Sequence, residues 1–508
     1  MQHLIRSRRQ ASIAWLLTAG AVLCMNCWTL TLSPVIFQDE IQIVDLGRAT
    51  LPDADLTWGL QWSNQGRTAR APAFLGAALQ ELAFRFSGAQ ILGPRLSSQV
   101  GLLLASAALL GWMTTVGVSP TVAFLGSLLL LMEPTLTQGT RGGRIDGLAI
   151  FFVILACWIV SATPRQSNGV ALVGLCAAGI CLALSLLVWP SSLLAFPLLW
   201  IPLSARNVAD GGPSPSRVAM AFAELGLLGV ICAGSVAFAV ACLPAHGAPE
   251  LTDFRAGVSG TTSVSAAGAV SWAAGMGTLF TDLKSSPWLI PWAFCGMLFR
   301  RRWAILLPAC ASIAGVVATR VYFYRTVYVV PILLIAAIVA SDEILKRCRD
   351  SRTNTIGVVL TAGLLLVSFA SSLAFLGART YIALHERGTR DPAILEALAA
   401  STIGPGPLRV YLGPWEFYPA GRRLGWKMYR NGLANQLLDW EHEPEFLDCA
   451  ILESAEIPGV VESQLRAHGF VKTTVRPSMP VDTPAPEKNY DHEYIFYFRA
   501  GVGGRQRR

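Results

Sequence analysis

The chain has 508 residues, of which 53% are hydrophobic and only 14% are charged, and its mean hydropathy is +0.49. Because a soluble domain carries about 25% charged residues, this composition excludes a single large water-soluble globule. The net charge of +8 belongs to the hydrophobic part, since residues 378–508 hold 16 basic and 16 acidic residues. Orientation in a membrane explains these cations better than nucleic acid does, so we expect no nucleic-acid partner.

Long apolar stretches occupy the chain as far as residue 377. They predict about eleven membrane-spanning helices, at 12–36, 96–118, 121–138, 147–163, 169–189, 191–204, 218–243, 287–299, 303–319, 327–341 and 355–377. A span needs about 20 apolar residues, so the stretches 191–204 and 287–299 are short. The first stretch could instead be a signal peptide, but its apolar run is longer than the core of about 7 to 15 residues that a signal peptide has.

Lys and Arg collect at alternate ends of these spans. Cytoplasmic loops carry the excess of Lys and Arg, and a cytoplasmic N-terminus places these clusters on that side: Arg6, Arg8, Arg9, Arg165, Arg206, Arg217, Arg300 to Arg302, Lys346, Arg347, Arg349 and Arg352. With an odd number of spans, the loops 37–94 and 244–286 and the region after 377 lie outside the cytoplasm. We expect a multi-pass protein of the bacterial plasma (inner) membrane, because the outer region shows little sign of glycosylation sequons.

The composition changes abruptly after residue 377. Strand-like and helix-like segments then alternate, which predicts a small α/β domain over residues 378–500 outside the cytoplasm. The helix-like segments are 391–400 and 458–468, and the strand-like ones are 408–412, 446–452, 470–475 and 494–498. Residues 501–508 are predicted to be a disordered tail. Residues 1–377 form the transmembrane domain, with the outer loop 37–94.

Two adjacent acids, Asp39 and Glu40, follow the first apolar stretch directly. An ionised carboxylate at a lipid boundary is costly unless it faces a polar cavity or a partner, which makes such acids functional candidates. The alternative is that they only end a helix in the headgroup region.

A second group of charges, Arg141, Arg144 and Asp146, lies in a short predicted outer loop and departs from the positive-inside pattern. A planar guanidinium suits phosphate oxygens, which it binds through two parallel hydrogen bonds. These arginines are therefore candidates for binding an anion. The alternative is a salt bridge from Arg144 to Asp146 or Glu133.

Further cations are predicted at the outer surface. Arg320 and Arg325 lie between two spans, together with Tyr322 and Tyr324. Tyrosines at this level are often interface anchors, so they are supporting candidates. Arg70 in the first outer loop and Arg95 at the start of the second span complete the set.

Acids beside arginines on the outer face of a membrane protein suit the transfer of a group from a lipid phosphate. Nucleotide sugars are made in the cytoplasm, so an outward-facing glycosyltransferase would draw on a polyprenyl-phosphate sugar. A carboxylate would take the proton from the acceptor hydroxyl, and arginines would stabilise the departing phosphate. One base and one displacement predict inversion at the anomeric carbon.

Several short segments resemble the C-type glycosyltransferase superfamily, and most closely the group of protein O-mannosyltransferases and lipid A aminoarabinose transferases. The likeness covers roughly residues 12–345 and is carried by Gln38-Asp39-Glu40, Arg70-Ala-Pro72, Gly93-Pro-Arg95-Leu-Ser-Ser98 and Arg144-Ile-Asp146.

The resemblance implies that Asp39 is the catalytic base, with Glu40 as its neighbour. It also implies that Arg70 contacts the donor phosphate, although the family often has Lys-Pro-Pro-Leu where this chain has Arg-Ala-Pro-Ala. Finally, it implies that helices of the first outer loop lie along the membrane surface. Residues 72–86 suit this, since their apolar residues recur at near-helical spacing, although a twelfth span is an alternative.

We therefore expect a membrane glycosyltransferase with Asp39 and Glu40 as catalytic acids. The candidate phosphate contacts are Arg70, Arg141, Arg144, Arg320 and Arg325, and the supporting residues are Asp146, Tyr322 and Tyr324. The donor would be a polyprenyl-phosphate sugar, and the acceptor a lipid, glycan or protein. Asp39 and Glu40 could hold a divalent cation, but no richer cluster of oxygen ligands supports one, so no metal site or other cofactor is assigned.

Two other classes of function remain open at this stage. A transporter or lipid flippase would line a translocation path with its charges, but such proteins tend to show repeated halves and polar residues near the midplane. A scaffold protein would act through residues 378–508 alone.

Overall fold

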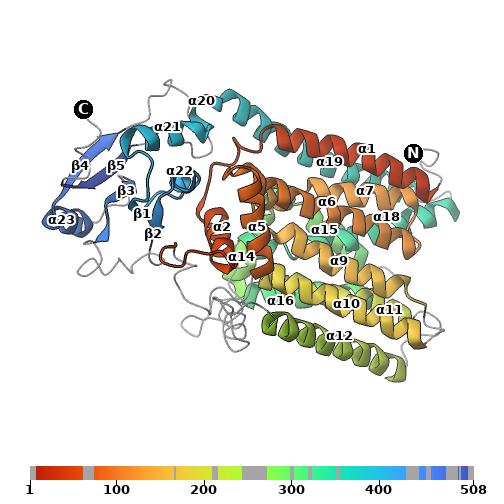
Figure 1. Ribbon diagram of the computed structural model, residues 1–508. Helices are drawn as coiled ribbons and strands as arrows, with labels where there is room; N and C mark the ends of the chain where they lie inside the picture. Colours follow the sequence, from red (N-terminus) through yellow and green to blue (C-terminus); the bar gives the residue numbers. More distant parts are fainter. Residues whose placement is uncertain are drawn as a thin grey trace.

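The computed structural model describes residues 7–60, 74–164, 168–208, 215–242, 272–297, 302–318, 323–350, 355–430, 446–453, 459–475, 490 and 493–500. It consists of a helical bundle with a small α/β domain at one end (Figure 1). Two short helices, α2 (Gln38–Thr50) and α5 (Phe74–Phe86), lie between these two parts. The predicted class, a polytopic helical membrane protein with a small C-terminal α/β domain, is confirmed.

Every predicted span falls on a helix or on a pair of helices in the structure. The elements of the bundle are α1 (Arg8–Trp28), α6 (Leu92–Thr115), α7 (Pro120–Met132), α8 (Pro134–Arg141), α9 (Asp146–Ala162), α10 (Asn168–Val188), the 3-10 helix η2 (Pro190–Leu199), α11 (Trp200–Val208), α12 (Pro215–Ala241), α14 (Trp272–Asp282), the 3-10 helix η3 (Leu283–Ser285), α15 (Leu289–Met297), α16 (Arg302–Ala318), α17 (Phe323–Thr326), α18 (Val330–Asp350) and α19 (Thr355–His385).

In the described residues, five helices are long and apolar enough to cross a bilayer, or six if α7 and α8 form one span. These two helices meet at an angle of 46°. Pro134 explains the bend, because a proline disfavours helical backbone at the residue before it, and Glu133 has a ψ of 126°. The count of eleven spans stays a prediction.

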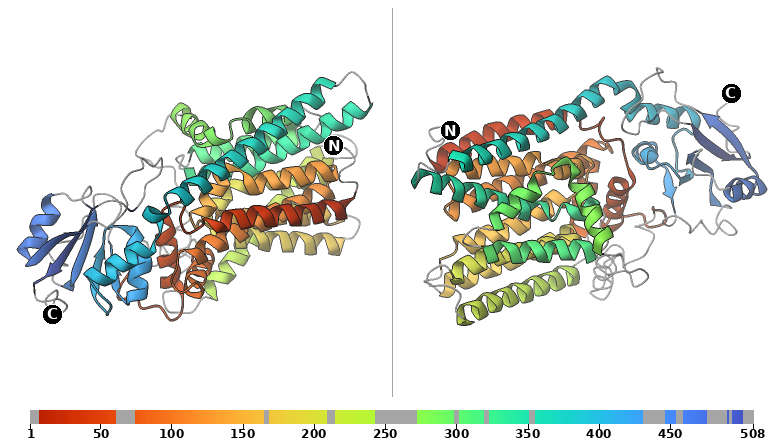
Figure 2. Two further views of the ribbon diagram at one scale, coloured as in Figure 1. Left: turned by 90° about the horizontal axis from the view of Figure 1, so that it is seen from above. Right: turned by 180° about the vertical axis from the view of Figure 1, so that it is seen from behind.

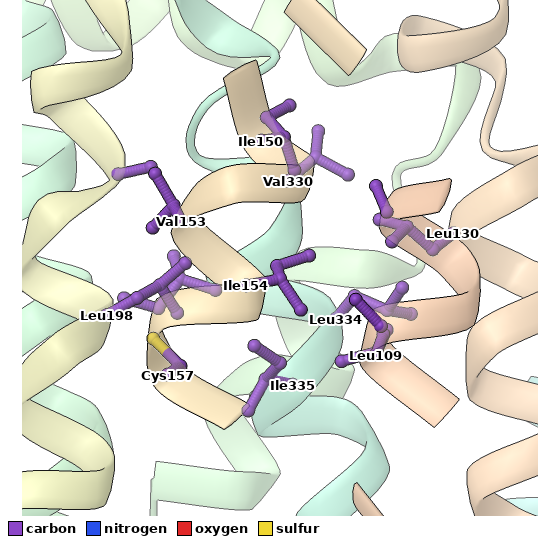
Figure 3. Close-up of a cluster of buried hydrophobic side chains, with 14 of the residues drawn as sticks. Leu109, Leu130, Ile150, Val153, Ile154, Cys157, Leu198, Val330, Leu334 and Ile335 are labelled. Atoms are coloured by element: carbon purple, nitrogen blue, oxygen red, sulfur yellow. The ribbon is translucent and has the colours of Figure 1, made fainter. Parts of the chain in front are cut away.

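The interior of the bundle is built from one face of each helix. In α9, Ile150, Val153, Ile154 and Cys157 recur at the spacing of a single helix face and are fully buried. Figure 3 shows these side chains meeting others from α6, α7, η2 and α18, namely Leu109, Leu130, Leu198, Val330, Leu334 and Ile335. Because lipid tails are as apolar as these side chains, close packing rather than water exclusion holds such helices together.

Glycines bring α6 and α9 close together. A Cβ atom at Gly101 would lie 2.7 Å from the backbone nitrogen of Leu148, and one at Gly147 would lie 2.8 Å from that of Leu102. The two glycines therefore let the backbones approach in the first half of α6 and at the start of α9. This contact places Asp146, the first residue of α9.

The first outer loop folds into helices that lie across the end of the bundle, as Figures 1 and 2 show for α2 and α5. Helix α5 has 13 residues, which at about 1.5 Å per residue is too short for a hydrocarbon core of about 30 Å. The structure therefore favours the surface helix over the twelfth span. A Cβ atom at Gly47 would lie 1.9 Å from the carbonyl oxygen of Ala77, so α2 and α5 pack in direct backbone contact.

The C-terminal domain begins later than residue 377, because α19 continues to His385. Its helices are α20 (Arg387–Arg390), α21 (Ala393–Thr402), the 3-10 helix η5 (Trp415–Phe417), α22 (Tyr418–Leu424) and α23 (Gly459–Ala467). Its strands are β1 (Arg409–Leu412), β2 (Lys427–Tyr429), β3 (Cys449–Glu453), β4 (Phe470–Val475) and β5 (Tyr494–Arg499). The predicted disordered tail, 501–508, lies outside the described residues.

The five strands form one sheet in the order β2-β1-β3-β5-β4. Strand β1 is parallel to β2 and β3, whereas β5 is antiparallel to β3 and β4. Four of these strands match predicted segments, and β2 was not predicted. In both views of Figure 2, the C-terminal domain and the start of α1 lie at opposite ends of the bundle.

The close approach of α6 and α9 gives a first prediction. Gly101→Ala adds the Cβ atom that would meet the backbone of Leu148, and overpacking of this kind costs about 1–3 kcal/mol. We expect a lower midpoint of thermal unfolding in detergent. Gly226→Ala on α12 is the control, because no atom lies within 4 Å of a Cβ there; equal midpoints for the two variants would contradict the prediction.

Candidate active site

The predicted acids and arginines meet at the end of the bundle that faces the C-terminal domain. Asp39 and Glu40 lie in the first turn of α2. Helix α8 ends at Arg141, and α9 begins at Asp146. The connection between α8 and α9 is thus packed against the start of α2, and it is buried rather than an exposed loop.

Arg144 joins two carboxylates from separate segments. Its Nη1 atom lies 2.7 Å from Oδ2 of Asp39, and its Nε atom lies 2.7 Å from Oδ2 of Asp146. The hydroxyl of Tyr328, just before α18, donates to Oδ1 of Asp146 at 2.6 Å. The ring of Trp189 lies 5.5 Å from the guanidinium carbon of Arg144, within the range of a cation–π contact. The salt bridge from Arg144 to Asp146 is one of the two that the sequence offered as an alternative to anion binding. The ion pair of Arg144 with Asp39 was not part of that alternative.

Asp39 is the accessible member of this group. Its side chain is 20% exposed, whereas those of Arg144 and Asp146 are 3% and 4% exposed. Burial raises the pKa of the Asp39 carboxyl, Arg144 opposes this effect, and Asp146 adds to it, so that the pKa lies above its usual value. A carboxylate that is partly exposed, held in place and made more basic has the properties of a general base.

Glu40 points away from Asp39 and forms a different ion pair, with Arg95. Its Oε1 and Oε2 atoms accept from Nε and Nη2 of Arg95 at 2.7 and 2.9 Å, and both side chains are fully buried. Arg95 also donates to the carbonyl oxygens of Leu30 and Pro34. This pair fastens the start of α2 to α6 and to the segment after α1.

A glycine makes room for Glu40. Gly143 has a φ of +70°, and a Cβ atom there would lie 2.6 Å from Oε1 of Glu40. Both the left-handed backbone and the close contact favour glycine at this position. The carbonyl oxygen of Gly143 also accepts from Nε2 of Gln80 at 2.8 Å, which ties the α8–α9 connection to α5.

Arg141 is turned toward the end of α1 and the segment that follows it. Its Nη1 and Nη2 atoms donate to Asn26, Thr29 and Ser33, chiefly to their carbonyl oxygens, at 2.8–3.2 Å. Cations near a helix C-terminus satisfy the last carbonyls and interact favourably with the helix dipole. The structure therefore brings Arg144, and not Arg141, into contact with Asp39.

The structure describes the other predicted site residues only in part. Arg70, Arg320 and Tyr322 lie outside the described residues. Tyr324 lies on α17, and its side chain is also outside the described part of the chain. Arg325, on the same short helix, is half-buried.

Three residues at this site were not predicted to act there. Tyr328 and Trp189 lie at the ends of predicted spans, where an aromatic residue usually indicates only the membrane interface. Arg95 was predicted as an outer cation, but not as the partner of Glu40. In the sequence, each of these residues shows only as a side chain with a polar group beside an apolar stretch. Nothing in the neighbouring sequence identifies the residue that this group contacts. In the described part of the chain, no group of three or more His, Cys, Asp or Glu residues is arranged to hold a metal ion.

Comparison with solved structures identifies the fold. The chain superimposes on crystal structures of ArnT from Cupriavidus metallidurans, bound to undecaprenyl phosphate (TM-score 0.61, 13% identity) and in the apo state (TM-score 0.62, 12% identity). The match covers 97–98% of this chain and 99–100% of ArnT. The chain has the C-type glycosyltransferase fold.

A second protein of known structure shares this fold within a longer chain. The mycobacterial arabinofuranosyltransferase AftD, in its R1389S form, matches with a TM-score of 0.51 at 14% identity, over 97% of this chain and 42% of AftD. No family model and no curated protein sequence matches the chain. The fold expected from the short sequence segments is therefore confirmed by structure alone.

The buried pair of Glu40 and Arg95 gives a second prediction. Glu40→Ala leaves the Arg95 guanidinium buried without its carboxylate, which costs about 3–5 kcal/mol. We expect a clear drop in the midpoint of thermal unfolding in detergent. The double variant Glu40→Gln/Arg95→Met removes both charges and should recover at least half of the loss; a double variant as unstable as the single one would contradict this account.

Proposed function

We propose that this chain is a membrane glycosyltransferase that moves a sugar from a polyprenyl-phosphate donor to an acceptor hydroxyl on the extracytoplasmic face. The observation that carries the proposal is the position of Asp39, a partly exposed carboxylate held by Arg144 at the end of the bundle. The structural likeness to ArnT, which has been crystallised with undecaprenyl phosphate, supports this class of donor.

In the proposed reaction, Asp39 accepts the proton of the acceptor hydroxyl as its oxygen attacks the anomeric carbon. The bond between that carbon and the phosphate oxygen breaks, and polyprenyl phosphate leaves with the electron pair. General-base catalysis of this kind contributes about 10²- to 10⁴-fold. A single displacement inverts the configuration at the anomeric carbon.

The neighbouring residues hold the base in place. Arg144 fixes the direction of the Asp39 carboxylate, Asp146 holds Arg144, and Tyr328 in turn holds Asp146. Glu40 anchors the helix that carries Asp39 and has no exposed surface of its own. We therefore assign Asp39 as the catalytic residue and Glu40 as a residue that positions it.

Arginines remain the proposed contacts of the donor phosphate, because preorganised cations stabilise the charge that develops on a leaving phosphate. Arg141 is directed toward α1, and Arg144 already holds two carboxylates. Arg325, on the short helix α17, also keeps this proposed role. Arg70 and Arg320 are proposed for it from the sequence alone.

The proposed cellular location is the bacterial plasma (inner) membrane, with the N-terminus in the cytoplasm and the C-terminal domain outside. Basic residues support this orientation. Arg8 and Arg9 lie at the start of α1, and Lys346 and Arg347 lie near the end of α18. Helix α2, which carries Asp39, lies at the opposite end of the bundle, near the C-terminal domain (Figure 1). A donor attached to a lipid can reach that face from the outer leaflet.

The direct test is to incubate the purified protein with a panel of polyprenyl-phosphate sugars and with candidate lipid, glycan and protein acceptors. We expect free polyprenyl phosphate to be released together with a glycosylated acceptor of inverted configuration. Transport of a labelled substrate into vesicles without any glycosidic product would instead favour a transporter.

A third prediction concerns the base itself. Asp39→Asn keeps the shape of the side chain but cannot accept a proton, so kcat should fall by at least about tenfold while the protein still folds and inserts. Asp53→Asn is the matched control, because Asp53 lies on the same outer loop and its side chain is 64% exposed. Equal turnover in the Asp39→Asn and Asp53→Asn proteins would remove Asp39 from the mechanism.

A fourth prediction concerns pH. A base must be ionised to act, and the pKa of Asp39 is raised by burial, so activity should fall as the pH drops through a value above the usual Asp pKa of about 3.9. Arg144→Gln removes the cation that lowers the pKa of Asp39, and it should move this acid limb to higher pH. A profile of kcat against pH checks both points. An acid limb that stays in place in Arg144→Gln would contradict the assignment.

A further inference from the structure

Arg422 of the C-terminal domain forms an ion pair with the outer-loop helices. Arg422 on α22 lies with its Nη2 atom 2.7 Å from Oε1 of Glu81 on α5, and its Nη1 atom donates to Oε2 at 3.2 Å. The Glu81 side chain is fully buried and that of Arg422 is 14% exposed. Nη1 also donates to the hydroxyl of Tyr418 at 2.8 Å. The ring of Phe84 lies 5.4 Å from the guanidinium carbon of Arg422.

Tyr418 continues this contact to α2. Its hydroxyl donates to Oδ1 of Asp45 at 3.1 Å. The same oxygen accepts from Nε of Arg48 at 2.8 Å, and Oδ2 accepts from the backbone nitrogen of Leu60 at 2.8 Å. Asp45 and Tyr418 are both fully buried. A chain of buried polar contacts therefore runs from the C-terminal domain to the second half of α2.

Helix α2 is held at several points. Near its start, Glu40 is bound to Arg95 of α6, and in its second half Asp45 is bound to Tyr418. Two residues further on, Gly47 packs against the backbone of Ala77 on α5. At about 1.5 Å per residue, Asp39 lies about 9 Å along the helix from Asp45. Because Asp39 and Asp45 belong to one short helix, we expect a shift at Asp45 to move Asp39 as well.

We propose that Arg422 and Tyr418 are positioning residues, through which the C-terminal domain sets the place of Asp39 in the active site. The inference rests on the proposed function. It assigns the C-terminal domain a part in turnover, since neither residue touches Asp39 and both act through Asp45, Glu81 and the helices that carry them.

The type of contact supports this role. Burying charged groups carries a desolvation penalty, so a buried ion pair is by itself weak evidence for stability. The best-attested role of such a pair is to fix one relative position of the two elements that it joins. An apolar surface could dock the domain but would allow it to slide. A bidentate pair of an arginine with a carboxylate adds geometric specificity.

The test compares Arg422→Ala with Arg423→Ala in the full-length protein. Arg423 lies on the same helix, but it pairs with Glu396 inside the C-terminal domain. We expect Arg422→Ala to lower kcat by about tenfold to a hundredfold, because a misplacement of about 1 Å can cost 10²-fold. The KM for the donor should change by less than about threefold, because the donor contacts are unaltered. Arg423→Ala should keep the kcat of the unmodified protein.

Hydrogen exchange provides a second measurement that does not need activity. The amides of residues 39–50 should exchange faster in Arg422→Ala than in Arg423→Ala, while those of α9 should be unchanged. Tyr418→Phe removes one hydroxyl and should shift kcat and exchange in the same direction by a smaller amount. This milder variant decides the question if Arg422→Ala does not fold.

Two results would overturn the inference. One is equal exchange of residues 39–50 in the Arg422 and Arg423 variants. The other concerns the double variant of Arg422→Ala and Glu81→Gln. If its loss of kcat were the product of the two single losses, the two residues would act independently, whereas residues that act through one contact have effects that are not additive. If the unmodified protein transferred no sugar from any donor, the proposed function would fail, yet the exchange comparison would still decide the positioning role.

Discussion

Charged side chains at the boundary of a bilayer must be paired, and this constraint organises the end of the bundle. An isolated ion in a medium of low polarity is very costly. Here the two acids of α2 each meet an arginine from a different part of the chain, Asp39 with Arg144 and Glu40 with Arg95. These pairs fasten the outer loop to α6 and to the connection before α9. The same requirement for pairing thus builds the site and closes the end of the bundle.

The two neighbouring acids have different environments because consecutive residues of a helix point about 100° apart. Glu40 faces the bundle and is fully buried, with Gly143 leaving space for it. Asp39 faces the edge and keeps part of its surface exposed. One acid therefore anchors the helix, which leaves the other available for chemistry. An accessible carboxylate with a raised pKa suits proton abstraction.

The C-terminal domain belongs to the same system of contacts. Its strand β2 meets the outer loop at Gly59, which pairs with Tyr429, and its helix α22 meets α2 and α5. Helix α2 is thus bound by the bundle on one side and by the C-terminal domain on the other. This arrangement gives the small domain a mechanical connection to Asp39 that a flexibly tethered module would lack.

The sequence by itself determined the membrane class, the position of most apolar helices, the small α/β domain and the acids of α2, because hydropathy and composition are local properties. Helix α14 was not among them, since it lies in the predicted outer loop 244–286. Strand β2 escaped prediction because three residues, Lys427 to Tyr429, carry too little alternation. Only the tertiary structure decided which arginine meets which acid. Arg141 and Arg144 look alike in the sequence, yet one caps α1 and the other holds Asp39. Tyr328 completes the site from a point 182 residues beyond Asp146, because packing of helices, rather than spacing along the chain, brings such partners together.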